Sequence, residues 1–171
     1  TMDKRIYFSR EEMYKLNEYV SFRFLPNSHI VGATSIELFF KTPSGNIKKV
    51  YYSGDMGSPN NQQPFCDKSM IPSNANVVIT EATYSDMARN FNKNDVRKER
   101  EKLLQDIKNE LKNGKSILFG AFAMSRTQNL LYFLYENFAD DPTFNTPIYL
   151  DGKLSLQINN VYRKVLKDDD K

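Results

Sequence analysis

Two segments of alternating apolar and polar residues, joined by a short turn, constrain the fold of this chain most. In the first segment Ile36, Leu38 and Phe40 alternate with other residues, and the second segment runs from Ile47 to Tyr52. Between them lies the sequence Pro-Ser-Gly-Asn at 43–46, which is typical of a tight turn. Because successive side chains of a strand point to opposite faces, this pattern predicts a β-hairpin with one apolar face.

Residues that can bind metals lie at both ends of this hairpin. His29, the only histidine of the chain, precedes the first strand in a Pro-Asn-Ser-His-x-x-Gly turn, and Asp55 follows the second strand next to Gly54. Imidazole and carboxylate groups are normal ligands of zinc, but a structural zinc takes four ligands and a catalytic zinc takes about three plus water. A half-buried histidine at a turn and an aspartate that caps a loop explain the same residues, so the chemistry stays open at this point.

The composition permits a packed core and limits the function classes. Of the 171 residues 40% are hydrophobic and 26% are charged, which is typical of a globular protein. The net charge of +3 permits a nucleic-acid partner without requiring one. The single cysteine, Cys66, excludes an internal disulfide and a cysteine-rich metal site, and it fits a reducing cytoplasm. No segment approaches the ~18 apolar residues of a membrane-spanning helix, so we expect no membrane partner.

The second half of the chain alternates between strand and helix patterns. Short apolar runs at 76–80, 116–119 and 147–150 predict buried strands. Amphipathic stretches follow these runs and predict helices near 94–113, 125–138 and 154–166. Such alternation favours a parallel sheet covered by helices.

Two further patterns concern the first half of the chain. Ser9 is followed three positions later by Glu12, the spacing of a capping box, which predicts a short helix to about Tyr19. Residues 58–76 are rich in Pro, Asn, Gln and Ser and predict a long connection without regular structure.

Several motifs occur in an order that is informative as a set. They are Asn-Ser-His-Ile-Val-Gly-Ala at 27–33 with Tyr-Ser-Gly-Asp-Met-Gly at 52–57, Val-Val-Ile-Thr-Glu-Ala-Thr-Tyr at 77–84, Gly-Ala-Phe-Ala-Met-Ser-Arg-Thr-Gln at 120–128 and Thr-Pro-Ile-Tyr-Leu-Asp-Gly at 146–152. This set resembles the β-CASP nuclease branch of the metallo-β-lactamase superfamily, which includes the RNase J group and the mRNA 3′-end cleavage endonuclease. Ser85, where the family often has Gly, and Gly120, where it often has Pro, are mild departures that concern backbone shape.

The resemblance implies an α/β fold in two parts. Residues 1–88 would form the second part of a metallo-β-lactamase αββα core with a mixed sheet. Residues 89–171 would form the first part of a β-CASP-like parallel α/β domain. A shift in composition near 86–94 agrees with this boundary, and the chain looks like an internal fragment of a longer protein.

The resemblance also implies roles for individual residues. His29 would ligate one zinc of a two-zinc centre, and Asp55 would bridge both zincs as a ligand with a catalytic role. Glu81 would support catalysis by orienting a histidine ligand that another segment supplies. Arg126 and Gln128, at the start of a helix, would bind substrate phosphate. Structural roles remain as alternatives: a surface carboxylate for Glu81, and an arginine that ties the strand-helix turn.

The resemblance implies that the chain is part of a zinc-dependent phosphodiesterase. Its substrate would be RNA or DNA, with RNA favoured. The family's His-x-His-x-Asp-His motif is absent upstream of His29. We therefore expect this chain alone to lack tightly bound zinc and nuclease activity, and to need missing N- and C-terminal segments as partners. A metal-free family remnant that serves as a binding or assembly module is the alternative, and a small-molecule hydrolase of the same fold is a weaker one. Homo-oligomer formation stays open.

Overall fold

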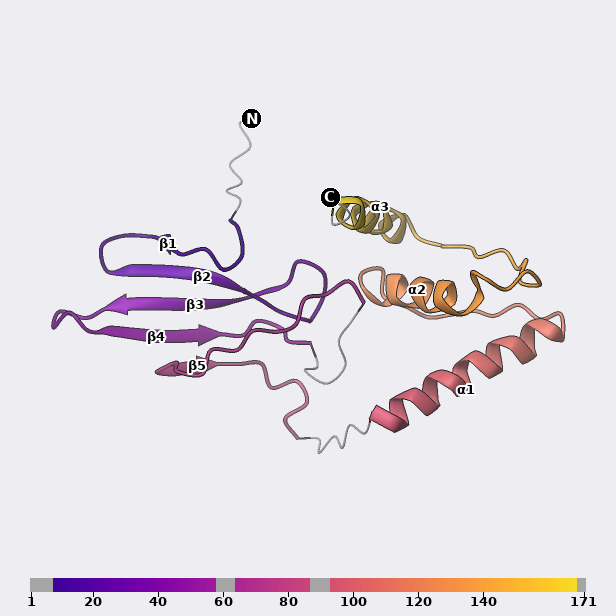
Figure 1. Ribbon diagram of the computed structural model, residues 1–171, viewed down its shortest axis with the longest axis horizontal. Coiled ribbons are helices and arrows are strands. Elements are labelled where there is room, and N and C mark those ends of the chain that lie inside the picture. Colours follow the sequence, from indigo (N-terminus) through magenta and orange to yellow (C-terminus); the bar gives the residue numbers. More distant parts are fainter. Residues whose placement is uncertain (1–7, 58–63, 87–92, 169–171) are drawn as a thin grey trace. The chain divides into compact units, whose positions relative to one another are not determined.

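The computed structural model of the protein describes residues 8–57, 64–86 and 93–168 (Figure 1). The chain divides into two compact units, Thr1–Ala88 and Arg89–Lys171. The first unit contains a five-stranded sheet and the second contains three helices, so the chain as a whole is α/β.

The sheet of the first unit is mixed and follows the chain order β1-β2-β3-β4-β5. Strands β1 to β4 pair antiparallel, and β5 pairs parallel with β4. The bounds of the strands are β1 Tyr14–Lys15, β2 Val20–Pro26, β3 Thr34–Lys41, β4 Ile47–Tyr52 and β5 Val77–Ile79.

The predicted hairpin is confirmed as β3 and β4. Ile36 pairs with Tyr52 and Leu38 pairs with Val50, so the apolar positions of both strands share one face. In the turn the backbone N–H of Gly45 donates to the carbonyl oxygen of Thr42 at 2.8 Å. Gly45 has a φ of +85°, which explains why a glycine occupies the turn.

The two faces of the sheet differ in polarity. One face carries aromatic and aliphatic side chains, and Phe8 and Tyr14 pack on Phe22 there with ring centroids at 5.5 and 5.7 Å. The other face carries the most deeply buried side chains of the sheet, among which polar groups are frequent. These residues are Leu25, Ser35, Glu37 and Tyr51, each at most 2% exposed.

The helix predicted near the start of the chain is wrong. The groups that would close the capping box bind Tyr14 instead, because the Tyr14 hydroxyl donates to Glu12 Oε2 at 2.8 Å and accepts the Ser9 backbone N–H at 2.6 Å. Glu11 has a φ of +66°, which is outside the helical region, and its N–H donates to the Phe24 carbonyl at 2.7 Å. Pairing with β2 therefore prevails over the local helix signal.

The strand predicted after the long connection is confirmed as β5, but its predicted burial is wrong. Val77, Val78 and Ile79 are 50%, 59% and 51% exposed. Only β4 pairs with β5 among the described strands, so β5 is the edge of this sheet.

The second unit contains α1 Lys93–Lys112, α2 Arg126–Phe138 and α3 Lys153–Asp168. The predicted helices are confirmed, with ends that differ by a few residues. A core forms between α1 and α2, where Ile107 packs with buried residues of α2 and with the partly buried Phe144. Apolar residues at helical spacing in α1 and α2 therefore supply this core. None of the described helices is long and apolar enough to cross a membrane.

The predicted strands at 116–119 and 147–150 are not formed as strands. Both segments are described, and neither makes a backbone hydrogen bond to another described residue. Leu118 is 96% exposed and Tyr149 is 87% exposed, so the prediction of buried strands is wrong here. A short apolar run becomes a buried strand only when neighbouring strands and a covering layer are present.

The buried ion pair of the sheet gives a prediction about stability. Arg23 and Glu37 face each other across β2 and β3, with Arg23 Nε at 2.6 Å from Glu37 Oε2, and Glu37 is fully buried. Replacing Arg23 by Ala leaves this buried carboxylate without its cation, so we expect the first unit to lose about 2–4 kcal/mol of unfolding free energy.

Urea unfolding followed by hydrogen exchange of sheet peptides measures this loss separately from the helical unit. The matched control is Arg97→Ala, which removes an exposed helical pair with Glu101 and is expected to cost about 0.5 kcal/mol or less. Equal effects of the two substitutions would contradict the account of the pair.

Candidate functional site

The turn that carries His29 is fixed by the side chain of Asn27, the residue after β2. Asn27 is 3% exposed, and its Oδ1 accepts the backbone N–H of His29 at 2.9 Å. This local bond is one reason why asparagine is favoured in turns. Gly32 has a φ of +82° and lets the chain turn back into β3. His29 itself is half-buried.

The loop that carries Asp55 follows β4 and lies against the His29 turn. The Asn27 Nδ2 group donates to the carbonyl oxygens of Ser53 and Asp55, both at 3.0 Å. Gly57 approaches Ser28 so closely that a Cβ at Gly57 would overlap the Ser28 carbonyl oxygen. The Asp55 side chain is exposed, so its carboxylate is accessible beside the turn.

Glu81 follows β5 and reaches the same loop. Its Oε1 accepts the backbone N–H of Met56 at 2.6 Å, and its Oε2 accepts the Thr83 hydroxyl at 2.6 Å. The Glu81 N–H donates to Ser53 Oγ at 3.2 Å. Because Met56 directly follows Asp55, the Glu81 carboxylate fixes the backbone beside the predicted metal ligand.

The electrostatics of Glu81 follow from these contacts. The hydrogen bond from the Thr83 hydroxyl contributes most to holding the pKa of the Glu81 carboxyl below its ordinary value of 4.5, and the Met56 N–H contributes next. The nearby His29 lowers the same pKa by a smaller amount, while partial desolvation opposes the shift. The ionised carboxylate is therefore the form that the folded structure stabilises.

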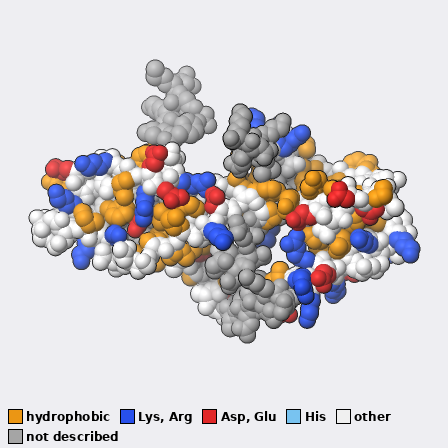
Figure 2. Space-filling view, in the orientation of Figure 1, with side chains coloured by type: hydrophobic (Ala, Val, Ile, Leu, Met, Phe, Trp, Pro, Cys, Tyr) orange, Lys and Arg blue, Asp and Glu red, His pale blue; other side chains and the backbone are white. Residues whose placement is uncertain are grey.

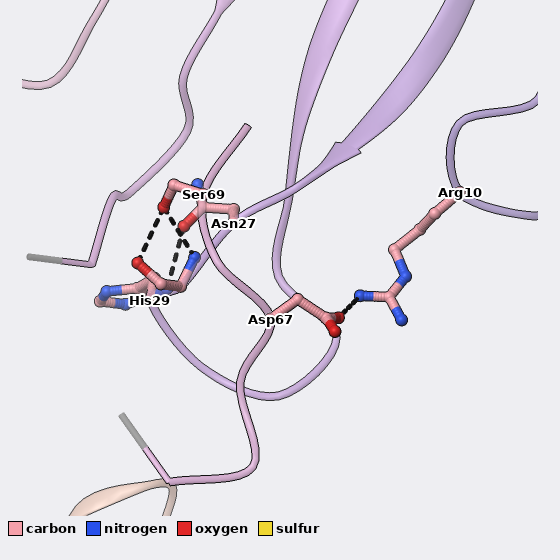
Figure 3. Close-up of polar contacts among 6 residues, drawn as sticks. Arg10, Asn27, His29, Asp67 and Ser69 are labelled. Atoms are coloured by element: carbon pink, nitrogen blue, oxygen red, sulfur yellow. Dashed lines mark hydrogen bonds and ion pairs between the residues drawn. The ribbon is translucent and has the colours of Figure 1, made fainter. Parts of the chain in front are cut away.

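A fourth segment, which contains Asp67 and Ser69, lies beside the His29 turn (Figure 3). Ser69 Oγ accepts the Ser28 N–H at 3.0 Å and lies 2.8 Å from Ser28 Oγ. Asp67 forms an exposed ion pair with Arg10. The segment therefore covers one side of the turn and is tied to the start of the chain.

These segments meet because of the topology of the sheet. Strands β2, β4 and β5 all end at the same end of the sheet, and β3 begins there, since β3 is antiparallel to its neighbours and β5 is parallel to β4. Three sequence-predicted residues, His29, Asp55 and Glu81, lie on loops at this end.

The other two predicted residues lie in the second unit. Arg126 is the exposed first residue of α2. Gln128 is 4% exposed, and its Nε2 donates to the Ala123 carbonyl at 3.2 Å and to Asn159 Oδ1 of α3 at 3.3 Å. Gln128 therefore ties the turn before α2 to α3, a structural role that the sequence did not indicate, whereas the Arg126 side chain is exposed.

The residues present do not by themselves fit a zinc centre. Among the residues that the structure describes, no three or more His, Cys, Asp or Glu side chains are grouped so that they could hold a metal ion. Catalytic zinc needs about three protein ligands. Of the expected ligands the chain supplies His29 and Asp55, and Glu81 has both oxygens engaged by Met56 and Thr83.

Two residues of the site were missed in the sequence. Asn27 and Gly57 lie inside the motifs, but their contacts join segments that are far apart in the chain. The available signals were an asparagine two residues before the only histidine and a glycine two residues after Asp55.

The close approach of Gly57 to Ser28 gives a prediction. Gly57→Ala forces the two loops apart, because the added methyl group meets backbone rather than a movable side chain, and we expect a loss of about 2 kcal/mol in the first unit. Gly120→Ala is the matched control, since Gly120 has no atom within 4 Å of an added Cβ. Urea unfolding and hydrogen exchange give the unfolding free energies of both variants. An unchanged stability of Gly57→Ala would contradict the close packing of the two loops.

The lowered pKa of Glu81 gives a prediction about pH. A lowered pKa means that the ionised carboxylate stabilises the fold above its ordinary value of 4.5, and that this contribution disappears as the pH falls through the lower value in the folded state. The stability advantage of the wild-type chain over Glu81→Gln is therefore expected at neutral pH and should shrink below about pH 4.5.

Unfolding in urea at a series of pH values measures this difference for the sheet. Glu18→Gln, at an exposed glutamate of the same unit, is the matched control and is expected to leave stability at neutral pH unchanged. A difference between wild type and Glu81→Gln that grows as the pH falls would contradict the stated contacts.

Comparison with known proteins gives two matches to ribonucleases. The chain is 28% identical over 128 residues to Ribonuclease TTHA0252 of Thermus thermophilus, which covers 75% of this chain and 28% of that protein. It is 26% identical over 149 residues to an RNase J-like protein of Methanocaldococcus jannaschii, which covers 84% of this chain and 32% of that protein. No family model matches the chain.

The chain thus spans less than a third of the length of these curated relatives. Their similarity extends over most of the chain and includes both units. It confirms the resemblance predicted from the motifs: the chain is similar to ribonucleases of the β-CASP branch of the metallo-β-lactamase superfamily.

Proposed function

We propose that this chain carries part of the active site of a β-CASP-type, zinc-dependent ribonuclease. The observation that supports this most directly is the meeting of the His29 turn, the Asp55 loop and Glu81 at one end of the sheet, joined by hydrogen bonds. Ligands of α/β proteins often bind where strands end, because loops from several strands converge there. The two similar proteins are ribonucleases by name.

The two units fit the two parts of such an enzyme. We assign residues 1–88 to the second part of a metallo-β-lactamase core, since the mixed sheet and the His29 and Asp55 motifs lie there. We assign residues 89–171 to the first part of a β-CASP-like domain, since the motifs at 120–128 and 146–152 lie there. The order of the motifs supports both assignments.

The proposed roles follow the chemistry of each side chain. His29 and Asp55 would be metal ligands, and Asp55 is exposed as such a role requires. Glu81 would act by holding the Asp55 loop through its hydrogen bond to the Met56 N–H.

Contact with the substrate is proposed for the second unit. Arg126 is exposed at the start of α2, and its guanidinium suits a phosphate of RNA or, as a less favoured substrate, DNA. On the face that Figure 2 shows, basic and acidic side chains are interspersed in both units. Substrate recognition by a few individually positioned basic side chains agrees with this surface better than binding through a broad basic patch.

The shortage of ligands limits what the chain does alone. One imidazole and one carboxylate are fewer groups than a catalytic zinc requires, so polypeptide outside this chain would supply the others. The same shortage favours a second candidate function, in which the chain is a metal-free remnant that binds nucleic acid or assembles with another protein.

The test is RNA cleavage by the chain alone and by the chain supplied with the polypeptide that its genome encodes on either side. We expect no cleavage alone and zinc-dependent cleavage in the supplied form, lost on adding a chelator. His29→Ala and Asp55→Asn should each lower the rate about 100-fold or more, because each removes a metal ligand.

Asn46→Ala, in the exposed β3–β4 turn, is the control that should leave the rate unchanged. Full cleavage in chelator, or full cleavage by His29→Ala, would overturn the proposal. RNA binding without cleavage and without zinc in elemental analysis would support the second candidate instead.

A further inference from the structure

We propose that Asn27 is the positioning residue of this site, which makes the His29 turn and the Asp55 loop move as one unit. The amide oxygen of Asn27 binds one loop, and the amide nitrogen binds the other. The oxygen accepts the His29 N–H at 2.9 Å, and the nitrogen donates to the Asp55 carbonyl at 3.0 Å. The amide thereby joins the backbones of the two loops directly.

Burial makes this link strong. Asn27 is 3% exposed, and Ser53, whose carbonyl also accepts from Asn27 at 3.0 Å, is 1% exposed. Water therefore has little access to the Asn27 amide and the Ser53 carbonyl, and leaving either of these buried groups unpaired is costly. The two loops should separate rarely while the amide is intact.

Neighbouring hydroxyl groups hold the Asn27 amide in this orientation. Ser35 Oγ lies 3.2 Å from Asn27 Nδ2, donates to the Ser53 carbonyl at 2.7 Å and accepts the Tyr51 hydroxyl at 3.0 Å. The carbonyls lie on the side of the amide nitrogen and the His29 N–H on the side of the oxygen, so a flipped amide would lose its partners. The site thus specifies an amide rather than a carboxylate at Asn27.

The consequence for catalysis rests on the proposed function. An imidazole and a carboxylate that act together must be held in one geometry, and a link between their backbones does this before any ligand arrives. Asn27 itself touches neither substrate nor reacting atoms, so its role is positioning. The link that Asn27 forms between the two loops can be tested without measuring nuclease activity.

The test compares Asn27→Asp with Asn27→Ala by residue-resolved amide hydrogen exchange of the full chain. Asn27→Asp keeps an oxygen for the His29 N–H but replaces the donor to Ser53 and Asp55 by a second oxygen. We expect exchange at Met56 to become about tenfold faster in Asn27→Asp while His29 stays protected, and both amides to exchange faster in Asn27→Ala. The ring signals of His29, the only histidine, report its surroundings in the same samples.

Asn46→Asp is the matched control, because the same chemical change is made in an exposed turn. Unchanged exchange at Met56 in Asn27→Asp would overturn the inference. Equal acceleration throughout β3 and β4 would also overturn it, since it would show a general loss of stability instead of a link between two loops. Failure of the ribonuclease assay with this exchange pattern intact would count against the proposed function alone.

Discussion

The structure of the candidate site depends on one requirement: polar backbone groups that are buried where several strands end must be hydrogen-bonded. At the end of β2 and β4 a single amide, that of Asn27, hydrogen-bonds the carbonyl groups of Ser53 and Asp55 and the N–H of His29. The Ser35 hydroxyl also donates to the Ser53 carbonyl. The Met56 N–H is satisfied by Glu81 in the same region. The positions of the candidate site residues are thus consequences of how their neighbours are paired.

Polar side chains on the buried face of the sheet extend the hydrogen-bond network of the site. This face contains an ion pair, Arg23 with Glu37, and the hydroxyl groups of Ser35 and Tyr51, which continue into the Asn27 network. Such a polar interior contributes less to stability than an apolar one, because the desolvation of charges offsets their attraction. A satisfied polar network does specify one strand register and one loop arrangement, and a functional site depends on such a fixed geometry.

Local patterns predicted the hairpin and the three helices, whereas the helix predicted after Ser9 and the strands predicted at 116–119 and 147–150 are not formed. The alternation of Ile36, Leu38 and Phe40 and the helical spacing around Ile107 predicted the hairpin and the helices, since these patterns depend on neighbours in sequence. The motifs predicted His29, Asp55 and Glu81, which the topology brings to one end of the sheet. The capping box at Ser9 failed because Tyr14 binds its groups, and the contacts of Asn27 and Gly57 were out of reach because their partners lie about 30 residues away.

The most direct measurement for this account is the set of nuclear Overhauser effects among the loops at the end of the sheet. We predict contacts from the Asn27 side-chain amide protons to residues 53–55, and from the Met56 amide proton to the Glu81 side chain. Their presence would establish that the His29 turn, the Asp55 loop and Glu81 form one site in solution. If the sheet is folded and both sets of contacts are missing, the central claim is contradicted.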